Sequence, residues 1–232
     1  MRLANHAGRA VIVTGDTVGV DVEQSSAGRF GPDVAALYED WEAFTAWAGT
    51  VDASVTERSP LEPGLLGPPS PRPRQVFGIG LNYREHAAET GQEVSRIPAT
   101  FTKFPTCITG PHAEVTLPSG YVDWEIELVV VIGRAAHGVA EDEAWSHVAG
   151  LTVGQDLSER VVQRAAGHAG DDLDAFGTER ADGAVHLPQR FGHVVHRQRG
   201  DERREEVRVL LHDLRHAVVR QASKLGGLIF IA

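Results

Sequence analysis

Alternating polar and apolar positions at the start of the chain predict β-structure. The run Arg9–Val20 alternates and is interrupted at Gly15-Asp16, which predicts a β-hairpin. Apolar residues spaced three or four apart then predict a helix over Asp33–Thr50, whose core-facing stripe is Val34, Leu37, Trp41, Phe44 and Trp47. Six of the 12 prolines follow between Pro60 and Pro73. These patterns predict a small N-terminal module over residues 1–59 and a proline-rich linker over 60–74.

A larger core begins after this linker. Gln75–Gly80 has the pattern of a short strand, and the good helix formers before Gly91 predict a helical segment next. The stretch Pro98–Pro105 then places Lys103 in an apolar strand bounded by prolines. Its ammonium group either extends past the neighbouring phenylalanines to solvent or reaches an anionic ligand.

A β-branched run further along predicts a strand that is buried on both faces. It consists of Leu128–Ile132, with Ile126 before it. Glu125 and Glu127 open this run, and they project to the same side because positions two apart on a strand share a face. Two adjacent carboxylates repel each other, and a hard divalent cation between them relieves the repulsion. The alternative is a solvated strand end with two surface acids.

A third acid strengthens the interpretation as a metal site. The apolar run Gly150–Asp156 ends in a carboxylate, and the acids and apolar spacing of Ala140–Val148 predict a helix between the two strands. Asp156 lies where a second helix is expected to start, so an N-cap role is the alternative. Three carboxylates at strand ends resemble an octahedral magnesium or manganese site that water or substrate completes.

A candidate base lies earlier in the core. His86 and Glu89 are three positions apart and share a face of a helical turn. A carboxylate beside an imidazole holds its orientation and raises its basicity, which suits a general base that activates water. The alternative is a surface ion pair.

Composition narrows the class of protein. The chain has 232 residues, is 42% hydrophobic and contains 25 glycines, which is typical of a globular protein with β-structure. A formal net charge of −10 argues against a nucleic-acid partner. A single cysteine, Cys107, excludes an internal disulfide. We find no signal-peptide pattern and no apolar run long enough to span a membrane, so a cytoplasmic location is expected.

Four motifs together resemble the fumarylacetoacetate hydrolase family, in that family's order and approximate spacing. They are Gly80-Leu-Asn-Tyr-Arg-Glu-His-Ala-Ala-Glu, Thr100-Phe-Thr-Lys-Phe-Pro, Asp123-Trp-Glu-Ile-Glu-Leu-Val-Val-Val-Ile-Gly and Thr152-Val-Gly-Gln-Asp-Leu-Ser-Glu-Arg. The resemblance is strong over residues 75–165. It implies an α+β fold, namely a mixed β-sheet roll with a small N-terminal α/β module, and usually a homodimer.

The resemblance also implies roles for named residues. Glu125, Glu127 and Asp156 would bind Mg²⁺ or Mn²⁺, and the pair of His86 and Glu89 would activate water. Three residues would bind the substrate, namely Lys103, Arg160 and Gln163. Family substrates are small 2-oxo acids and 1,3-diketo acids of catabolism, which are cleaved at a C–C bond, decarboxylated, hydrated or isomerised. A metal that chelates the 2-oxo-carboxylate and stabilises an enolate is common to these reactions.

Beyond Gln163 the motifs of the family are not recognisable. Relatives carry a Gly-Lys-Ser-Phe-like segment and later a Thr-Gly-Thr-Pro-like loop, and neither occurs here. We therefore divide the chain after the proline-rich linker into a family-like core over 75–167 and an atypical segment over 168–232. The apolar end of the second segment, Lys224–Ala232, requires burial. Hydrolase activity is the first hypothesis, with decarboxylase, tautomerase or hydratase as alternatives. Two further hypotheses are a metal-binding remnant without turnover and a frame-altered gene product.

Overall fold

Three antiparallel strands form the base of the N-terminal module. In the computed structural model, which describes residues 1–54, 56–80, 99–118, 120–163, 184–185, 194–195 and 227–231, these are β1 (Arg2–His6), β2 (Arg9–Val13) and β3 (Val18–Asp21). The pairing of β2 with β3 confirms the predicted hairpin. A second tight turn joins β1 to β2 through Ala7 and Gly8, whose φ values are 52° and 81°. Gly8 adopts this left-handed conformation at little cost because it has no Cβ.

Short helices pack against these strands. They are α1 (Val22–Ser25), α2 (Val34–Leu37), the 3₁₀ helix η1 (Tyr38–Asp40) and α3 (Trp41–Ala48). The predicted helix is therefore present, but a 3₁₀ turn divides it. Asp33 caps α2, since its Oδ1 accepts a hydrogen bond from the Ala35 N–H at 3.0 Å. The predicted apolar stripe is confirmed, because its members lie in or pack against one hydrophobic cluster with Leu3 and Ile12.

The proline-rich stretch is held against the module by strand pairing and hydrogen bonds. β4 (Ser59–Pro60) pairs with β3, and β5 (Leu66–Gly67) pairs with β1 after the 3₁₀ turn η2 (Pro63–Leu65). The Tyr38 hydroxyl donates a hydrogen bond of 2.8 Å to the Pro69 carbonyl. These contacts tie the stretch to the module, whereas the proposed boundaries of the chain's segments stay predictions.

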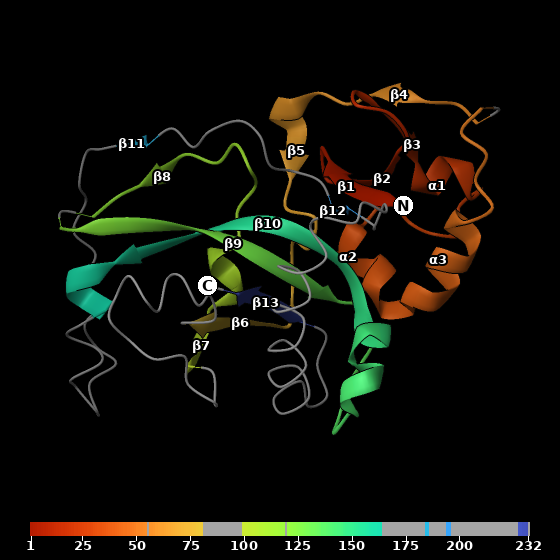
Figure 1. Cartoon of the computed structure of the whole chain (residues 1–232). Coiled ribbons are helices and arrows are strands. Elements are labelled where there is room, and N and C mark those ends of the chain that lie inside the picture. The colour runs from red at the N-terminus through yellow and green to blue at the C-terminus, as the bar shows by residue number, and fades with distance from the viewer. Residues whose placement is uncertain are drawn as a thin grey trace, which may run out of the picture.

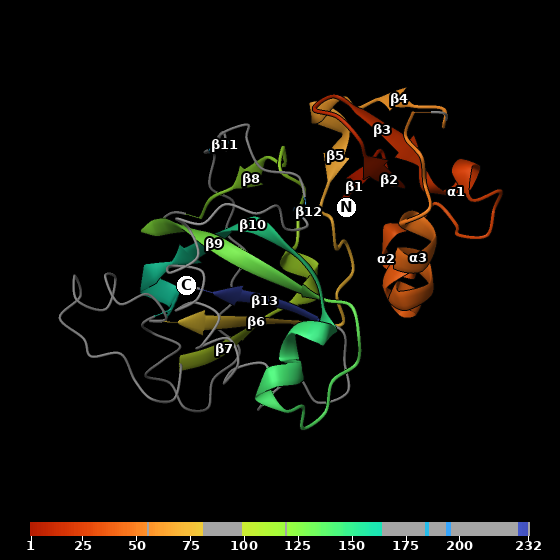
Figure 2. The same cartoon turned by 45° about the vertical axis from the view of Figure 1, so that its right-hand side comes forward.

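The described strands of the core continue the same sheet. They are β6 (Gln75–Gly80), β7 (Ala99–Lys103), β9 (Val122–Ile132), β10 (Val148–Glu159), β12 (Val194–Val195) and β13 (Gly227–Ile231). The sheet runs in the order β4-β3-β2-β1-β12-β10-β9-β13-β6-β7, and β8 (Val115–Thr116) pairs separately with β11 (Ala184–Val185). Figures 1 and 2 show the long ribbon of β9 and β10 lying above β13, β6 and β7. Pairing is parallel between β13 and β6 and antiparallel elsewhere, so the sheet is mixed and the fold class is α+β.

Strand β13 shows where the apolar end of the chain goes. It lies between β9 and β6 and pairs with both of them. Gly227–Ile231, part of the apolar end for which burial is predicted, is therefore an inner strand of the sheet. On the neighbouring strands, Val76, Val129 and Val131 form a buried cluster of the core.

Two details of the β9–β10 ribbon differ from the sequence prediction. Strand β10 runs past Asp156 to Glu159, and the helical turn 160–163 begins only after it, so an N-cap role for Asp156 is wrong. The reason is that β10 stays paired with β9 as far as Val122. The strand β9 is fully buried only in its second half, and Ile126 is 61% exposed. The segment between the two strands is the 3₁₀ helix η4 (Glu141–His147) rather than an α-helix.

Candidate active site

The β9–β10 ribbon brings the three predicted carboxylates onto one face. The two strands are antiparallel, and Asp156 lies directly opposite Glu125. Glu127 follows Glu125 by two positions on the same strand, so its side chain projects to the same face. Further along this face the side chains become apolar and buried, as with Val129 and Val131. The acids therefore lie where the inner face of the ribbon leaves the core.

Glu127 is the most unusual of the three. Its side chain is 1% exposed, and among the described residues neither of its carboxylate oxygens has a hydrogen-bond partner. The residue opposite is Gly154, which has no side chain to offer a partner. Burial, together with the charges of Asp156 and Glu125, raises the pKa of Glu127 to about 8, and Lys103 only partly opposes this. A buried carboxylate of this kind is the strongest indication of a cation site in the described part of the chain.

Lys103 reaches the carboxylates from another strand. Its Nζ forms an ion pair with Asp156 Oδ1. β7 is four strands away from β10 in the sheet order, which is about 19 Å in a flat sheet. A lysine side chain cannot span that distance, so the sheet must curl around the site. The prediction left open whether Lys103 extends to solvent or binds an anion, and its partner in this structure is an anionic side chain of the chain itself.

Arg160 bonds two acids of β9, Asp123 and Glu125. Its Nη2 donates hydrogen bonds to Glu125 Oε1 and, at 2.8 Å, to Asp123 Oδ2. Its Nε donates to the same Asp123 oxygen at 3.0 Å, and its Nη1 donates to Gln163 Oε1 at 2.9 Å. Arg160 and the Trp124 N–H together lower the pKa of Asp123 below its usual range. The structure thus brings Arg160 and Gln163 together, and their role in substrate binding stays a prediction.

Asp123 is the acid that the sequence interpretation missed. It precedes Glu125 by two positions, so Asp123, Glu125 and Glu127 form one row of acids on the same face of β9. The signal was present in the alternating pattern, which continues from Glu127 and Glu125 back to this residue. On the inner face of the ribbon, four carboxylates and two basic side chains now lie together.

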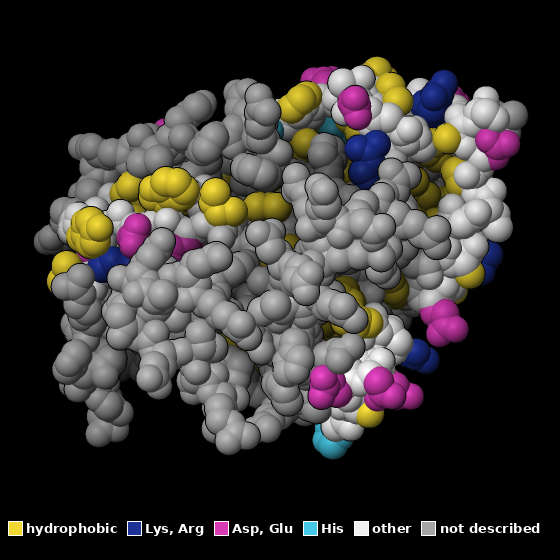
Figure 3. Space-filling model, in the orientation of Figure 1, with side chains coloured by type: hydrophobic (Ala, Val, Ile, Leu, Met, Phe, Trp, Pro, Cys, Tyr) yellow, Lys and Arg dark blue, Asp and Glu magenta, His cyan; other side chains and the backbone are white. Residues whose placement is uncertain are grey.

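A cavity of about 470 Å³ lies beside Asp156 and Lys103. The segment Cys107–Pro111 and the prolines Pro68 and Pro69 line it, together with residues of β9 and β10. Burial raises the pKa of the Cys107 thiol, with Lys103 opposing this shift and Asp156 adding to it. Hydrophobic side chains also form a row over β9 and β10 on the face seen in Figure 3. Trp124 and Ile126 of β9 are both 61% exposed.

The donor set fits a divalent cation, although no cage is closed in the described residues. Within that part of the chain, no group of three His, Cys, Asp or Glu side chains is arranged to enclose a metal ion. Glu125 and Asp156 are engaged by Arg160 and Lys103 instead. Carboxylate oxygens are nevertheless the ligands that Mg²⁺ and Mn²⁺ prefer, and no described residue donates a hydrogen bond to either oxygen of Glu127. The predicted base, His86 with Glu89, lies outside the described residues.

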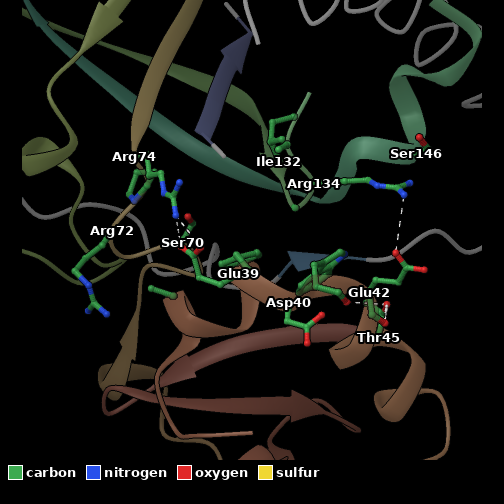
Figure 4. A pocket seen from close by; sticks show the side chains of 16 residues that line it. Glu39, Asp40, Glu42, Thr45, Ser70, Arg72, Arg74, Ile132, Arg134 and Ser146 are labelled. Carbon is green, nitrogen blue, oxygen red and sulfur yellow. Dashed lines mark hydrogen bonds and ion pairs between the residues drawn. The ribbon is translucent and has the colours of Figure 1, made fainter. Parts of the chain in front are cut away.

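A second cavity, of about 510 Å³, lies between the N-terminal module and the core. Figure 4 shows Glu39 beside Arg74, and Glu42 facing Arg134. Arg74 Nη2 donates to both carboxylate oxygens of Glu39, at 2.9 and 2.7 Å, and Arg134 approaches Glu42 at 4.0 Å. Because acidic and basic groups pair across it, this cavity has the character of a junction between the module and the core. In the described part of the chain no helix is long and apolar enough to span a membrane.

The sequence of the chain places it in a known family. The profile described as fumarylacetoacetate (FAA) hydrolase C-terminal matches residues 75–229. The chain therefore belongs to the fumarylacetoacetate hydrolase family, as its four motifs indicate. The matched span starts at the first residue of β6 and extends beyond Gln163, through the segment where no family motif is recognisable by eye, into β13.

Individual relatives agree with this assignment. A Burkholderia ambifaria protein named "Putative hydrolase" is 39% identical over an alignment of 140 residues that covers 54% of this chain and 50% of that protein. The chain thus spans about half the length of such curated relatives. The crystal structure of "a putative HpcE protein" from Mycobacterium smegmatis is 51% identical, with a TM-score of 0.62, over 70% of this chain and 57% of that one. Maleylpyruvate hydrolase from Sphingobium sp. SYK-6, solved with manganese(II) and pyruvate, shares the fold at 20% identity, with a TM-score of 0.63 over 100% of this chain and 87% of that one.

Proposed function

We propose that this protein is a divalent-metal-dependent hydrolase that cleaves a C–C bond of small 2-oxo or 1,3-diketo acids. Glu125, Glu127 and Asp156 would hold Mg²⁺ or Mn²⁺. The observation that carries the proposal is the buried Glu127, which lies beside two further carboxylates and whose two oxygens have no hydrogen-bond partner in the part of the chain that the structure describes. Membership in the family supports it, as does the manganese and pyruvate bound in the Sphingobium enzyme of the same fold.

The bound cation would polarise the 2-oxo-carboxylate group of the substrate and stabilise the negative charge that develops there. Lys103 and Arg160 already pair with Asp156 and Glu125. With Glu125 and Asp156 holding a cation, Arg160 and Lys103 would be available to bind the substrate's anionic groups. Gln163 would orient Arg160 through the hydrogen bond between them.

Proton transfer is assigned to the pair of His86 and Glu89. Glu89 would hold the imidazole ring in place, and a ring nitrogen of His86 would take a proton from the attacking water. The cavity of about 470 Å³ beside Lys103 and Asp156 is large enough for a small dicarboxylic acid. A homodimer, as is usual in the family, is part of the same proposal.

Thermal unfolding in the presence of metal tests the site. With Mn²⁺ at about 100 times its Kd, an intact site stabilises the folded protein by about 2.7 kcal/mol, and oxalate, a mimic of a 2-oxo-acid enolate, should add to this. The variants Glu127→Gln and Asp156→Asn should lose the response, whereas Asp142→Asn, the same change on the exposed face of η4, should keep it. No response in the wild-type protein would refute the proposal.

Product analysis then separates the reaction types. Incubation of the metal-loaded protein with acylpyruvates should release pyruvate and a carboxylic acid if it is a hydrolase. Release of CO₂ would instead indicate a decarboxylase, and a rearranged product of unchanged mass would indicate a tautomerase. A protein that binds Mn²⁺ and converts none of these compounds would be the metal-binding remnant.

A further inference from the structure

One acid of the row has no role in the proposed reaction. Asp123 lies at the outer end of the row on β9, and its side chain is 37% exposed. Its Oδ2 accepts two hydrogen bonds from Arg160, one from Nε and one from Nη2. Its Oδ1 accepts a third, of 2.9 Å, from the Trp124 N–H. Both carboxylate oxygens are therefore committed, and the side chain is fixed in its orientation.

The guanidinium group of Arg160 donates hydrogen bonds to two acids. Its Nη2 donates to Asp123 and also to Glu125, whereas its Nε donates to Asp123 alone. Glu125 is thus held by one nitrogen, Nη2, which also bonds Asp123, whereas Asp123 is held by two nitrogens, Nε and Nη2. When a cation takes the carboxylate of Glu125, Arg160 loses only one of its contacts and keeps its position against Asp123.

The backbone accounts for this arrangement. Asp123 and Glu125 lie two apart on β9, and the Arg160 N–H donates to the Tyr121 carbonyl at 2.8 Å, which extends the ladder beyond the last residue of β10. Arg160 thereby lies on the same face as the two acids and diagonal to Asp123, within reach of a long side chain. Glu125 lies next to the buried Glu127, whereas Asp123 lies two positions farther from it.

We propose that Asp123 is a positioning residue: it retains Arg160 and so frees Glu125 for the divalent cation. This inference rests on the proposed function, since it concerns the same metal site. Without Asp123, the guanidinium would turn wholly to Glu125, compete with the cation for it, and carry its positive charge closer to the metal. Arg160 would also no longer be held where it can bind an anionic substrate group.

Isothermal titration with Mn²⁺ on four proteins tests this: wild type, Asp123→Asn, Arg160→Gln and the double variant. Asp123→Asn should weaken Mn²⁺ binding about fivefold, within the range seen for neighbours in one ion-pair network. Arg160→Gln should tighten binding, because it removes the competitor. In the double variant, the change at Asp123 should have less than about a twofold effect, since Asp123 acts through Arg160. Physiological salt screens the remaining long-range effect of the lost charge.

Two further variants keep the result interpretable. Asp123→Glu retains a carboxylate and should restore most of the affinity, and a thermal melt without metal shows whether each variant is folded. Asp142→Asn removes an equal charge from η4 and should leave Mn²⁺ binding unchanged. Equal weakening by Asp123→Asn with and without Arg160, or by Asp142→Asn, would overturn the inference, as would no effect at all.

Failure of this inference can be told apart from failure of the proposed function. If the wild-type protein binds no Mn²⁺, the metal site itself is wrong and both ideas fall. If the wild-type protein binds Mn²⁺ and Glu127→Gln abolishes binding, but the effects at Asp123 and Arg160 simply add, the metal site stands and only the positioning role of Asp123 is refuted.

Discussion

The buried carboxyl of Glu127 makes the metal-free protein sensitive to pH. Its pKa lies near 8 in the folded chain against a usual value of 4.5, because burial and the charges of Asp156 and Glu125 disfavour ionisation. Between these two values the carboxyl is protonated in the folded state and ionised in the unfolded state. The unfolded state then binds fewer protons, so the free energy of unfolding falls as the pH rises through this window.

The replacement Glu127→Gln removes this dependence, because the amide is neutral at every pH and nearly the same shape. Within the window, each rise of one pH unit lowers the free energy of unfolding of the wild-type protein by about 1.4 kcal/mol. Relative to the variant, the wild-type protein should therefore lose about 3 kcal/mol between pH 4.5 and about pH 7, and little more above pH 8. Of a typical total of about 5–15 kcal/mol, that is a large share.

Urea unfolding with a chelator present, followed by tryptophan fluorescence, measures this difference. The quantity of interest is the free energy of unfolding of the wild-type protein minus that of Glu127→Gln, taken at several pH values. A difference that falls with pH and then levels off near pH 8 supports the account of the site. A difference that stays constant across the window would refute it, because Glu127 would then titrate alike in both states. Adding Mn²⁺ should restore stability to the wild-type protein alone.

Three further predictions concern the packing of the module. Phe44 is 0% exposed in the module core, so Phe44→Ala should cost about 3–5 kcal/mol in urea unfolding, and a loss below about 1 kcal/mol would contradict the packing. A Cβ on Gly133 would lie 2.8 Å from the Trp41 ring, so Gly133→Ala should lower stability by about 1–3 kcal/mol, whereas Gly31→Ala, with no atom within 4 Å, should not. Asp33→Ala removes the cap of α2 and should lower the free energy of unfolding by about 1 kcal/mol, which a thermal melt would show as a lower melting temperature. An unchanged melting temperature would show the cap to be dispensable.

Local patterns in the sequence were enough to predict much of the fold and part of the site. Alternation placed Glu125 and Glu127 on one face of a strand, and helical spacing identified the buried stripe of the module around Phe44. Proline boundaries placed Lys103 at the end of a strand, and the four motifs indicated the family. Each of these follows from the geometry of a single segment, because the period of two along a strand and of 3.6 along a helix belongs to the backbone itself.

Only the tertiary structure decides which of these segments meet. Asp156 faces Glu125 because β9 and β10 pair in one particular register, and the ion pair with Lys103 joins residues 53 positions apart through the curl of the sheet. The isolation of Glu127 arises because Gly154 happens to lie opposite it, and the link from Asp123 to Arg160 needs the end of β10 beside the start of β9. The exposure of Ile126 likewise depends on what covers the outer face of the ribbon. Such contacts reflect long-range pairing and burial, which no local period encodes, and they turn a row of acids into a candidate metal centre.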